Sequence, residues 1–397
     1  MTKIAVNPLS FPRKMYIDDV AVDVPPMGYA CITPTTPTVE TTGKKGLLHQ
    51  FFAPQSDPVL ARKAIDDIGR GVKRPVFILE NRFFSAKFDA VSGALRSIFT
   101  NRSRYNQLSR QIAFRNKQTY SNQVADEIVL TQETTETGQL KITGHLVFPD
   151  GATVAQFTET VTIRRQSRTL EFDLTVKPVA EMDDDRWNSY IATRYAWNDE
   201  TLELRGNLNE GMYVLPDEKH LHSPRVIDLR HEDSSLTFLS EGLPFHRRSG
   251  VRQIDTLLIV KGESQRRFRL GIAVNAKQPA LLSYDFAVGQ EGLVFPVQCP
   301  PKNHSSWLLQ VESTNVVALH WEPVLESDVL VGFMVYLQEV EGRRAHFALR
   351  SFVPPNRAAA MNFQGKELKT FKVNDDAVLI DMHAYELLPL MVRTATL

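Results

Sequence analysis

Apolar and polar residues alternate along several stretches in the first half of the chain. The clearest are residues 84–89, 141–148 and 169–177, in which apolar residues recur at every second position and His145 falls on the polar side. Such alternation places the apolar side chains on one face of a strand, which is typical of an antiparallel sheet with one buried face. Glycine-containing turns, such as Pro149-Asp150-Gly151, separate the stretches. We therefore expect an all-β protein built on a large antiparallel β-sandwich.

One segment favours a helix over a strand. Residues 57–69 begin with Asp57 as a candidate cap and Pro58 at the first helical position, and Gly69 is suited to end the helix. The segment also carries an apolar stripe at helical spacing, formed by Leu60, Ala64, Ile65 and Ile68. The sequence therefore predicts one short helix in an otherwise β-rich chain.

Two breaks in the pattern suggest three domains. Residues 34–46 are rich in threonine, proline and glycine and are typical of a loop or linker, and residues 296–306 form a polar, proline-containing break. We expect an N-terminal β segment with the linker and helix over residues 1–75. The main sandwich would occupy residues 76–300, and a C-terminal β-sandwich would occupy residues 301–397.

Composition narrows the class of protein. The chain of 397 residues has 46 Lys and Arg against 46 Asp and Glu, which argues against a nucleic-acid or anionic-membrane partner. There is no apolar run of about 18 residues, and the first residues lack the apolar core of a secretory signal. We therefore expect a cytoplasmic protein without a membrane span. The two cysteines, Cys31 and Cys299, are expected to be buried thiols, with a single bridge as the alternative.

Several short motifs resemble, in order and spacing, the β-rich part of glycoside hydrolase family 38, the α-mannosidases. The first is residues 6–13 (VNPLSFPR), which resemble the segment that opens this part of the family. The others are residues 24–29 (VPPMGY), 79–84 (LENRFF) with 92–95 (SGAL), 311–317 (VESTNVV) and 384–387 (AYEL). The resemblance implies a galactose-mutarotase-like supersandwich flanked by smaller β-sandwich modules.

The same resemblance implies that the catalytic part of the family is absent. In the family, zinc and the nucleophilic aspartate belong to an α/β barrel that precedes the segment matched at residue 6. The family's zinc motif pairs two histidines around one residue, with an aspartate two further on. Here the one such pair is His220 and His222, and position 224 is proline, which has no ligand atom. The resemblance thus implies a non-catalytic chain without its own zinc, working with a glycosidase catalytic domain in cis or in trans.

Two groups of residues carry side chains of the types that bind metal ions. The densest cluster of ligand-type residues runs from His220 to Asp233 and consists of His220, His222, Asp228, His231, Glu232 and Asp233. Alternation along a strand would send some of these side chains to opposite faces, so a polar loop and strand edge is favoured over a zinc site. For residues 183–185, three consecutive aspartates, a solvated acidic loop is favoured over a calcium site. We expect no metal site in this chain.

Residues 185–197 combine the groups that recognise sugars. If this stretch is a strand, Trp187 and Trp197 share a bulky face with Ser189, Ile191, Thr193 and Tyr195, which we assign to the core. Tyr190 and Arg194 share the other face, whose alanines leave room for a ligand. We predict a carbohydrate-binding set of Asn188, Tyr190 and Arg194, with Asp228 or Asp255 nearby if the strands pair suitably. The alternative is that these aromatic rings only fill a core.

Three functions remain open at this level. The first is a carbohydrate-related domain that supports or lines the substrate cleft of a glycosidase catalytic domain, with a mannoside-type ligand. The second is a free-standing epimerase-, mutarotase- or lyase-like enzyme that uses a histidine and a carboxylate. Its candidates are His145, His222, His246 and His304 with Glu171, Asp228 and Asp255, and the sequence gives no pairing. The third is a structural assembly module. The catalytic residues are unknown.

Overall fold

The computed structural model describes residues 2–18, 20–32, 58–67, 73–100, 105–232, 234–289, 293–298 and 301–394. Two compact units can be separated. Unit 1 consists of residues 1–56, 209–212 and 280–397, and unit 2 of residues 57–208 and 213–279. The three domains expected from the sequence, residues 1–75, 76–300 and 301–397, stay a prediction. The expected linker at 34–46, Cys299 and Asp233 lie outside the described residues.

Unit 2 contains the larger of two facing antiparallel sheets. Within the described residues this sheet has ten strands, with β10 (Thr119–Tyr120) paired to β9 off the main path. The strands in spatial order are β18 (His220–His222), β21 (Phe245–Gly250), β22 (Gln253–Ile259), β15 (Ser189–Trp197), β9 (Leu108–Asn116), β8 (Leu95–Thr100), β7 (Phe84–Asp89), β6 (Lys73–Glu80) and β5 (Leu60–Asp67).

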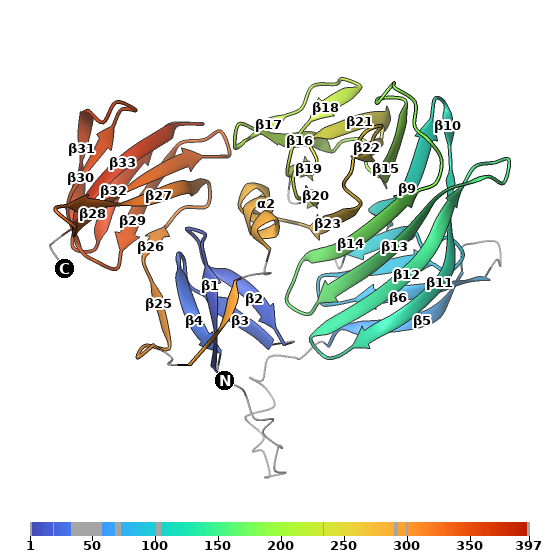
Figure 1. Cartoon of the computed structure of the whole chain (residues 1–397), viewed down its shortest axis with the longest axis horizontal. Coiled ribbons are helices and arrows are strands. Elements are labelled where there is room, and N and C mark those ends of the chain that lie inside the picture. Colours follow the sequence, from blue (N-terminus) through green and yellow to red (C-terminus); the bar gives the residue numbers. More distant parts are fainter. Residues whose placement is uncertain are drawn as a thin grey trace, which may run out of the picture. The chain divides into compact units, whose positions relative to one another are not determined.

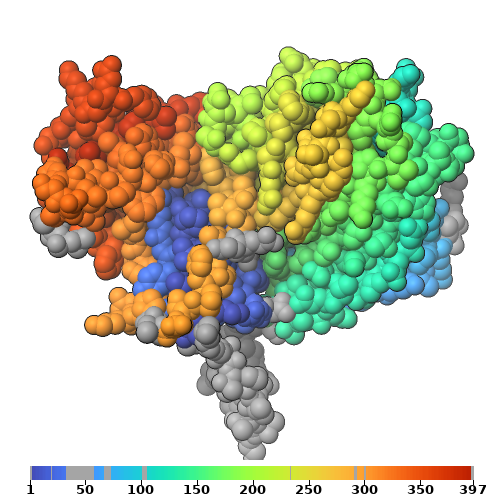
Figure 2. Space-filling view, in the orientation of Figure 1, coloured from blue at the N-terminus to red at the C-terminus, as the bar shows by residue number. Residues whose placement is uncertain are grey.

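The second sheet has nine strands in the described part of the chain. In spatial order they are β11 (Asn122–Glu133), β12 (Thr137–Val147), β13 (Thr153–Arg164), β14 (Thr169–Pro178), β23 (Arg267–Val274), β20 (Ser234–Ser240), β19 (Val226–His231), β16 (Glu203–Leu208) and β17 (Gly211–Val214). Figure 2 shows β11 to β14, coloured cyan to green, as a continuous surface. Long strands in both sheets give the supersandwich that Figure 1 draws in cyan, green and yellow.

The alternation in the sequence builds the core between these two sheets. Phe84 and Phe88 from the ten-stranded sheet and Phe172 from the nine-stranded sheet are fully buried in one hydrophobic cluster. The rings of Tyr195 on β15 and Phe238 on β20 stack across the sheets with centroids 4.1 Å apart. Gly151 adopts a positive φ angle in the turn expected at residues 149–151, and Gly93 does the same in the turn between β7 and β8. The predicted all-β supersandwich is therefore confirmed.

The helix predicted over residues 57–69 is wrong. Residues Leu60–Asp67 form the edge strand β5, which pairs residue by residue with β6 from Leu60 opposite Glu80 to Asp67 opposite Lys73. Ile65, assigned to the apolar stripe, is 73% exposed. The ladder with β6 gives the backbone its hydrogen bonds and overrides the helical propensity of this short segment. The proposed cap Asp57, with Ile68 and Gly69, lies outside the described residues.

Unit 1 contains three further antiparallel sheets in its described residues. The N-terminal pair of sheets consists of β24 (Val294–Val297), β1 (Thr2–Asn7), β4 (Gly28–Ile32) and β25 (Ser305–Trp307) in one, and β2 (Arg13–Ile17) with β3 (Val20–Val24) in the other. The third sheet has eight strands in the order β26 (Leu309–Val311), β29 (Ala345–Ser351), β32 (Ala377–Met382), β31 (Glu367–Asn374), β30 (Pro355–Met361), β33 (Leu387–Thr394), β28 (Val329–Glu339) and β27 (Val316–Glu326). Strands from both ends of the eight-stranded sheet share one apolar core, so the sheet folds over on itself.

The close approach of β4 and β25 requires glycine at position 28. Met27 carries the positive φ of 39°, while Gly28 begins β4. A Cβ atom on Gly28 would lie 2.1 Å from the carbonyl oxygen of Ser306 on β25. Glycine is needed at this position because two backbones approach closely.

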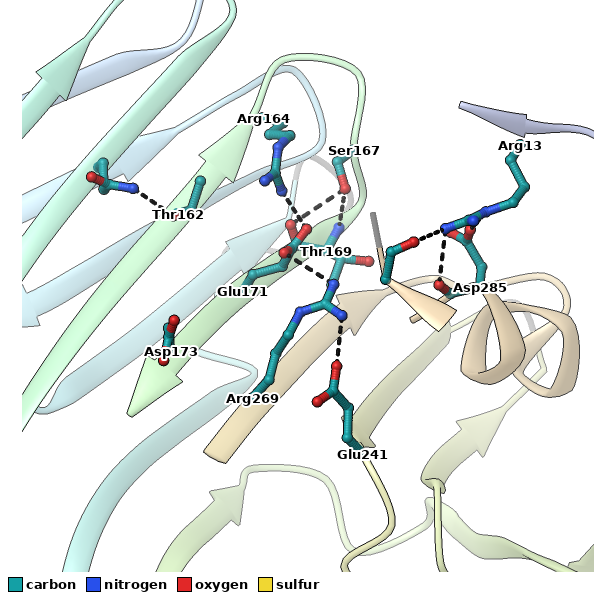
Figure 3. A network of polar contacts seen from close by, with 12 residues as sticks. Arg13, Thr162, Arg164, Ser167, Thr169, Glu171, Asp173, Glu241, Arg269 and Asp285 are labelled. Carbon is teal, nitrogen blue, oxygen red and sulfur yellow. Dashed lines mark hydrogen bonds and ion pairs between the residues drawn. The ribbon is translucent and has the colours of Figure 1, made fainter. Parts of the chain in front are cut away.

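A single helix, α2 (Pro279–Val288), occurs in the described ranges and was not predicted. Proline at its first position and Gly289 just after its end are the standard signals that could have found it. Arg13 on β2 donates to Asp285 on this helix and to the Gly289 carbonyl, which fixes the helix end to the N-terminal sheets (Figure 3). No helix among the described residues is long and apolar enough to cross a membrane.

Candidate functional site

Strand β15 divides its side chains between the core and the outer face of the ten-stranded sheet. Ile191, Tyr195 and Trp197 lie in the main core, as the alternation predicts. Tyr190 and Ala192 point the other way and form a small separate cluster with Leu257 on β22. The predicted assignment of faces is therefore confirmed for these residues.

Trp187 departs from that assignment. It precedes β15, and it packs beside the Tyr190 cluster and stacks on His220 with ring centroids 4.1 Å apart. The strand period does not apply to it because the backbone turns at residues 186–188. Its ring therefore belongs to the outer face, where its centroid lies 5.9 Å from that of the Phe245 ring.

Asp255 is the centre of the outer-face network. It lies directly opposite Arg194 in the β15–β22 ladder and is fully buried. Its carboxylate accepts hydrogen bonds from the Tyr190 hydroxyl at 2.7 Å, Arg194 Nε at 2.9 Å, the Tyr120 hydroxyl at 3.1 Å and Ser249 Oγ at 3.2 Å. Four donors compensate the burial of this carboxylate.

Tyr190 acts as a donor within this network. Burial, followed by the negative charge of Asp255, raises the pKa of Tyr190 far above its ordinary value. The phenol therefore stays protonated and donates to the carboxylate. Because its side chain is fully buried, Tyr190 positions Asp255 and does not reach solvent itself.

Arg194 is held on three sides. Its Nε binds Asp255, its Nη2 donates to the Gln253 side chain at 3.3 Å, and its guanidinium carbon lies 3.8 Å from the ring centroid of Tyr120. Stacking on an aromatic face and pairing with a carboxylate restrict the orientation of an arginine without engaging all five of its N–H donors. Arg194 is therefore pre-organised, with donor capacity left.

Asn188 is tied to this network by arginines. Arg247 donates to its Oδ1 at 2.8 Å, and Arg115 Nη2 lies 3.4 Å from the same atom. Arg115 also donates to the Tyr120 hydroxyl, so Asn188 and Asp255 are joined through Arg115 and Tyr120. Asn188 in turn donates to Asp185 at 2.7 Å.

A cleft of about 830 Å³ opens on the outer face beside Arg194. It is lined by Arg96, Ser109, Gln111, Ala196 and Gln253, among others. The residues next to these in sequence, such as Leu95, Arg110 and Ile254, are buried in the core, so the lining positions face outward. Small side chains at Ser109 and Ala196 leave the hollow between the longer ones. We call this the Arg194 cleft.

The other predicted acidic partner, Asp228, lies elsewhere. It sits on β19 of the nine-stranded sheet, where it accepts from Thr237 Oγ1 at 2.7 Å and Arg230 Nε at 2.9 Å. Of the two acidic residues expected as alternatives beside Arg194, Asp255 is there and Asp228 is not, because β15 pairs with β22 and β9, whereas β19 pairs with β16 and β20. The sequence reasoning also missed Arg115, Tyr120 and Ser249. These residues reach the site from other strands and turns, and no local signal marks them.

The carboxylates considered for acid–base chemistry are all engaged by other groups. Glu171 accepts from Arg164 and lies 3.4 Å from Arg269, which also donates to Glu241 at 2.8 Å (Figure 3). Asp228 and Asp255 have the partners described above. In the described part of the chain, none of these three carboxylates forms a hydrogen bond or ion pair with His145, His222, His246 or His304.

The histidines considered for that chemistry are dispersed. His246 is buried and bridges Thr256 Oγ1 at 2.9 Å and the Ser223 carbonyl at 2.8 Å. His145 pairs with Asp126 at 2.9 Å on the other sheet, and His222 packs edge-on against Phe245. His304 lies in unit 1, where its carbonyl accepts from the Cys31 amide.

The cluster of ligand-type residues from His220 onward is divided between two sheets. His220 and His222 lie on β18, and Asp228 and His231 lie on β19. In the part of the chain that the structure describes, no three His, Cys, Asp or Glu side chains are grouped to hold a metal ion.

No family model and no curated protein matches the sequence. Among solved structures, an α-mannosidase from Enterococcus faecalis V583 matches 99% of this chain and 56% of its own, with a TM-score of 0.62 and 11% identity. A glycosyl hydrolase family 38 protein from Enterococcus faecalis matches 99% of this chain and 52% of its own, with a TM-score of 0.60 and 12% identity. A galactose mutarotase related enzyme from Lactobacillus acidophilus matches 51% of this chain and 97% of its own at 7% identity, with a TM-score of 0.30, which is too low to support an inference.

The chain spans about half the length of the two Enterococcus proteins. At such low identity this likeness establishes the fold and not the activity. The resemblance inferred from the sequence motifs is thereby confirmed at the level of fold: over almost its whole length the chain has the β-rich fold of about half of a family 38 glycoside hydrolase chain.

Proposed function

We propose that this chain is a carbohydrate-related β domain, corresponding to the C-terminal part of an α-mannosidase, that works with a glycosidase catalytic domain in cis or in trans. In this proposal the Arg194 cleft binds a saccharide, and so lines or supports the substrate-binding region of the catalytic domain. The observation that carries it is Arg194 itself, fixed by Asp255 and Tyr120 at the edge of an open cleft. The names of the two Enterococcus structures supply the sugar class.

The chemistry of the cleft suits sugar hydroxyl groups. Arg194 offers N–H donors, and the amides of Gln111 and Gln253 offer both donors and acceptors. Sites that bind small ligands are typically about 300–1,000 Å³ with a few fixed polar groups, and the cleft falls within that range. A short saccharide fits these dimensions and these donors.

The predicted binding set divides into two roles in this proposal. Arg194 contacts the ligand. Tyr190 and Asp255, which are fully buried, position Arg194, and Asn188 supports them through Arg115. Asp228 is not included because it lies on the other sheet. The sugar-active enzyme alternative would need a histidine and a carboxylate facing one another in a cleft, and the His145–Asp126 pair does not line the Arg194 cleft.

The proposal is tested by titrating mannose and mannobiose into the wild-type chain by calorimetry. A single-sugar site with few contacts predicts a millimolar Kd, about −4 kcal/mol. Arg194→Ala should weaken binding by about tenfold or more, because it removes a charged hydrogen-bond donor. Arg267→Ala, which removes an arginine paired with Asp173 on the other sheet, should bind as wild type does.

Equal binding by wild type and Arg194→Ala would show that the cleft is not the site. Failure of both sugars to bind at tens of millimolar would contradict the saccharide role and would leave the chain as a structural module.

A further inference from the structure

The side chains around the Arg194 cleft carry more positive than negative charge, although the whole chain is neutral. Arg74, Arg96 and Arg194 line the cleft together with the carboxylate of Asp89. Arg110 also borders it, but its guanidinium is turned into the core, where it binds Glu159. The groups that can face a ligand are therefore mainly cationic.

The nearby carboxylates are already occupied. Asp89 accepts from the amides of Val91 and Ser92 at 3.0 and 2.8 Å within its own turn. Asp66 is shared by Lys87 at 3.0 Å and Arg96 at 3.4 Å. Asp255 is buried beneath Arg194.

Arg74 stands apart from these pairs. It is exposed, it lies opposite Asp66 in the β5–β6 ladder, and no ion pair is formed by it among the residues that the structure describes. Three cations that line the cleft (Arg74, Arg96 and Arg194) thus accompany one lining carboxylate, Asp89, which is engaged within its own turn. Such an excess in a concave surface attracts an anion.

We propose that the cleft takes an anionic saccharide, with its carboxylate or phosphate ester at Arg74 and Arg96 and its ring hydroxyls at Arg194 and Gln253. This rests on the proposed function and names its ligand class. Arg96 on β8 and Gln253 on β22 are three strand spacings apart, about 14 Å. Ser109 and Ala196 lie between them on β9 and β15, so the floor leaves space for one or two sugar rings between the cationic and the amide side.

The test compares mannose, mannuronate and mannose 6-phosphate as calorimetric titrants at low salt, with acetate and inorganic phosphate as anions without a sugar. Either mannuronate or mannose 6-phosphate should bind about tenfold more tightly than mannose, because its anionic group adds one hydrogen bond to a charged side chain. Which acidic sugar is preferred identifies the source of the anion. The preference should shrink at high salt, because exposed charges are screened.

Two variants locate the anion. Arg74→Gln should weaken the preferred acidic sugar about threefold and leave mannose unchanged, as expected for one partly exposed charge pair. Lys141→Gln removes one positive charge from the exposed side of β12 on the other sheet. It should change neither the binding of the acidic sugar nor that of mannose.

The remaining outcomes overturn the inference in distinguishable ways. Equal binding of mannose and both acidic sugars would contradict the anionic ligand and leave the proposed saccharide function standing. Binding of acetate or phosphate as tight as that of the acidic sugars would mean a general anion site. If no sugar binds, the inference fails together with the proposed function. If acidic sugars bind but Arg74→Gln has no effect, the anion does not lie at Arg74 and the assigned geometry is wrong.

Discussion

At the scale of single residues, the candidate site depends on one buried carboxylate. Asp255 accepts from Tyr190, Arg194, Tyr120 and Ser249, so it holds an arginine at a fixed angle and keeps the phenols oriented. A buried charge is tolerated only when such partners compensate it, and removing one partner leaves the others unpaired. Asp255 therefore links the stability of the outer face to the position of Arg194.

We predict that Asp255→Ala lowers the free energy of unfolding by about 3 kcal/mol, since it leaves the partly buried Arg194 and the buried Tyr190 hydroxyl without their acceptor. The midpoint of urea unfolding measures this. Asp184→Ala, which removes an exposed acid paired with Lys261, is the control and should leave the midpoint unchanged. An Asp255→Ala midpoint equal to that of wild type would show that the network contributes nothing to stability.

His246 gives a pH-dependent prediction. Burial lowers its pKa from 6.5 to about 4, although the Ser223 carbonyl at Nε2 favours the charged form. Between pH 4 and 6.5 the imidazole of His246 is therefore protonated more readily in the unfolded chain than in the folded one. The contribution of neutral His246 to the free energy of unfolding is present above pH 6.5 and is lost as the pH falls through 6.5 toward 4. A shift of this size corresponds to about 3 kcal/mol. The expected result is a fall in the free energy of unfolding over this range.

The measurement is chemical unfolding at pH 7, 6, 5 and 4 for wild type, His246→Gln and the exposed His383→Gln. The His246→Gln variant should show a shallower dependence, and His383→Gln should follow wild type. Identical slopes for wild type and His246→Gln would refute the assignment of this pH dependence to His246.

At the scale of elements, the two sheets of unit 2 are joined by an ion pair inside the sandwich. Arg110 on β9 donates to Glu159 on β13 at 3.0 Å and to Thr193 on β15 at 2.8 Å, and both charged side chains are almost fully buried. The arginine also lies over the ring of Phe172 at 4.1 Å. This pair fixes how β9 and β13 face one another, because its two partners come from different sheets.

We predict that Glu159→Gln costs about 3–5 kcal/mol of unfolding free energy, because it leaves the Arg110 charge buried without its counter-ion. The double variant Arg110→Met with Glu159→Leu should recover most of that loss, since it buries no charge. Thermal and urea unfolding of the three proteins provide the test. A double variant as unstable as the single one would mean that the pair fixes the packing in a way that apolar residues cannot replace.

The elements also show what sequence patterns can and cannot predict. The period of two in β7, β12 and β14 arises because each strand turns one face to a single core, so it could be recognised from the sequence alone. The helix predicted at Leu60–Asp67 was wrong because four apolar residues at helical spacing favour a helix only weakly. The segment instead pairs with β6 along its whole length. For the site, alternation assigned Tyr190 and Arg194 to one face. The pairing of Arg194 with Asp255 spans 61 positions, and no local pattern contains it.

At the scale of the whole molecule, the chain corresponds in fold to about half of each Enterococcus protein. The proposed partnership with a catalytic domain leads to a prediction about activity. The purified chain should not hydrolyse aryl α-mannosides, because its one pair of histidines around a single residue, His220 and His222, is followed by proline at position 224, where the zinc motif described above has aspartate. Release of the aryl group, followed by absorbance, measures this. Hydrolysis that survives repurification and is abolished by a chelator would overturn the prediction.

The central claim is that a saccharide binds at Arg194 on the outer face of the ten-stranded sheet. The most direct measurement is the side-chain Nε–H signal of Arg194 in protein labelled with ¹⁵N-arginine, assigned with Arg194→Lys and followed while mannobiose and mannuronate are added. The account predicts that this signal shifts in a saturable way, while the signal of Arg267 on the other sheet stays in place. Saturable binding of either sugar that leaves the Arg194 signal unmoved would contradict it.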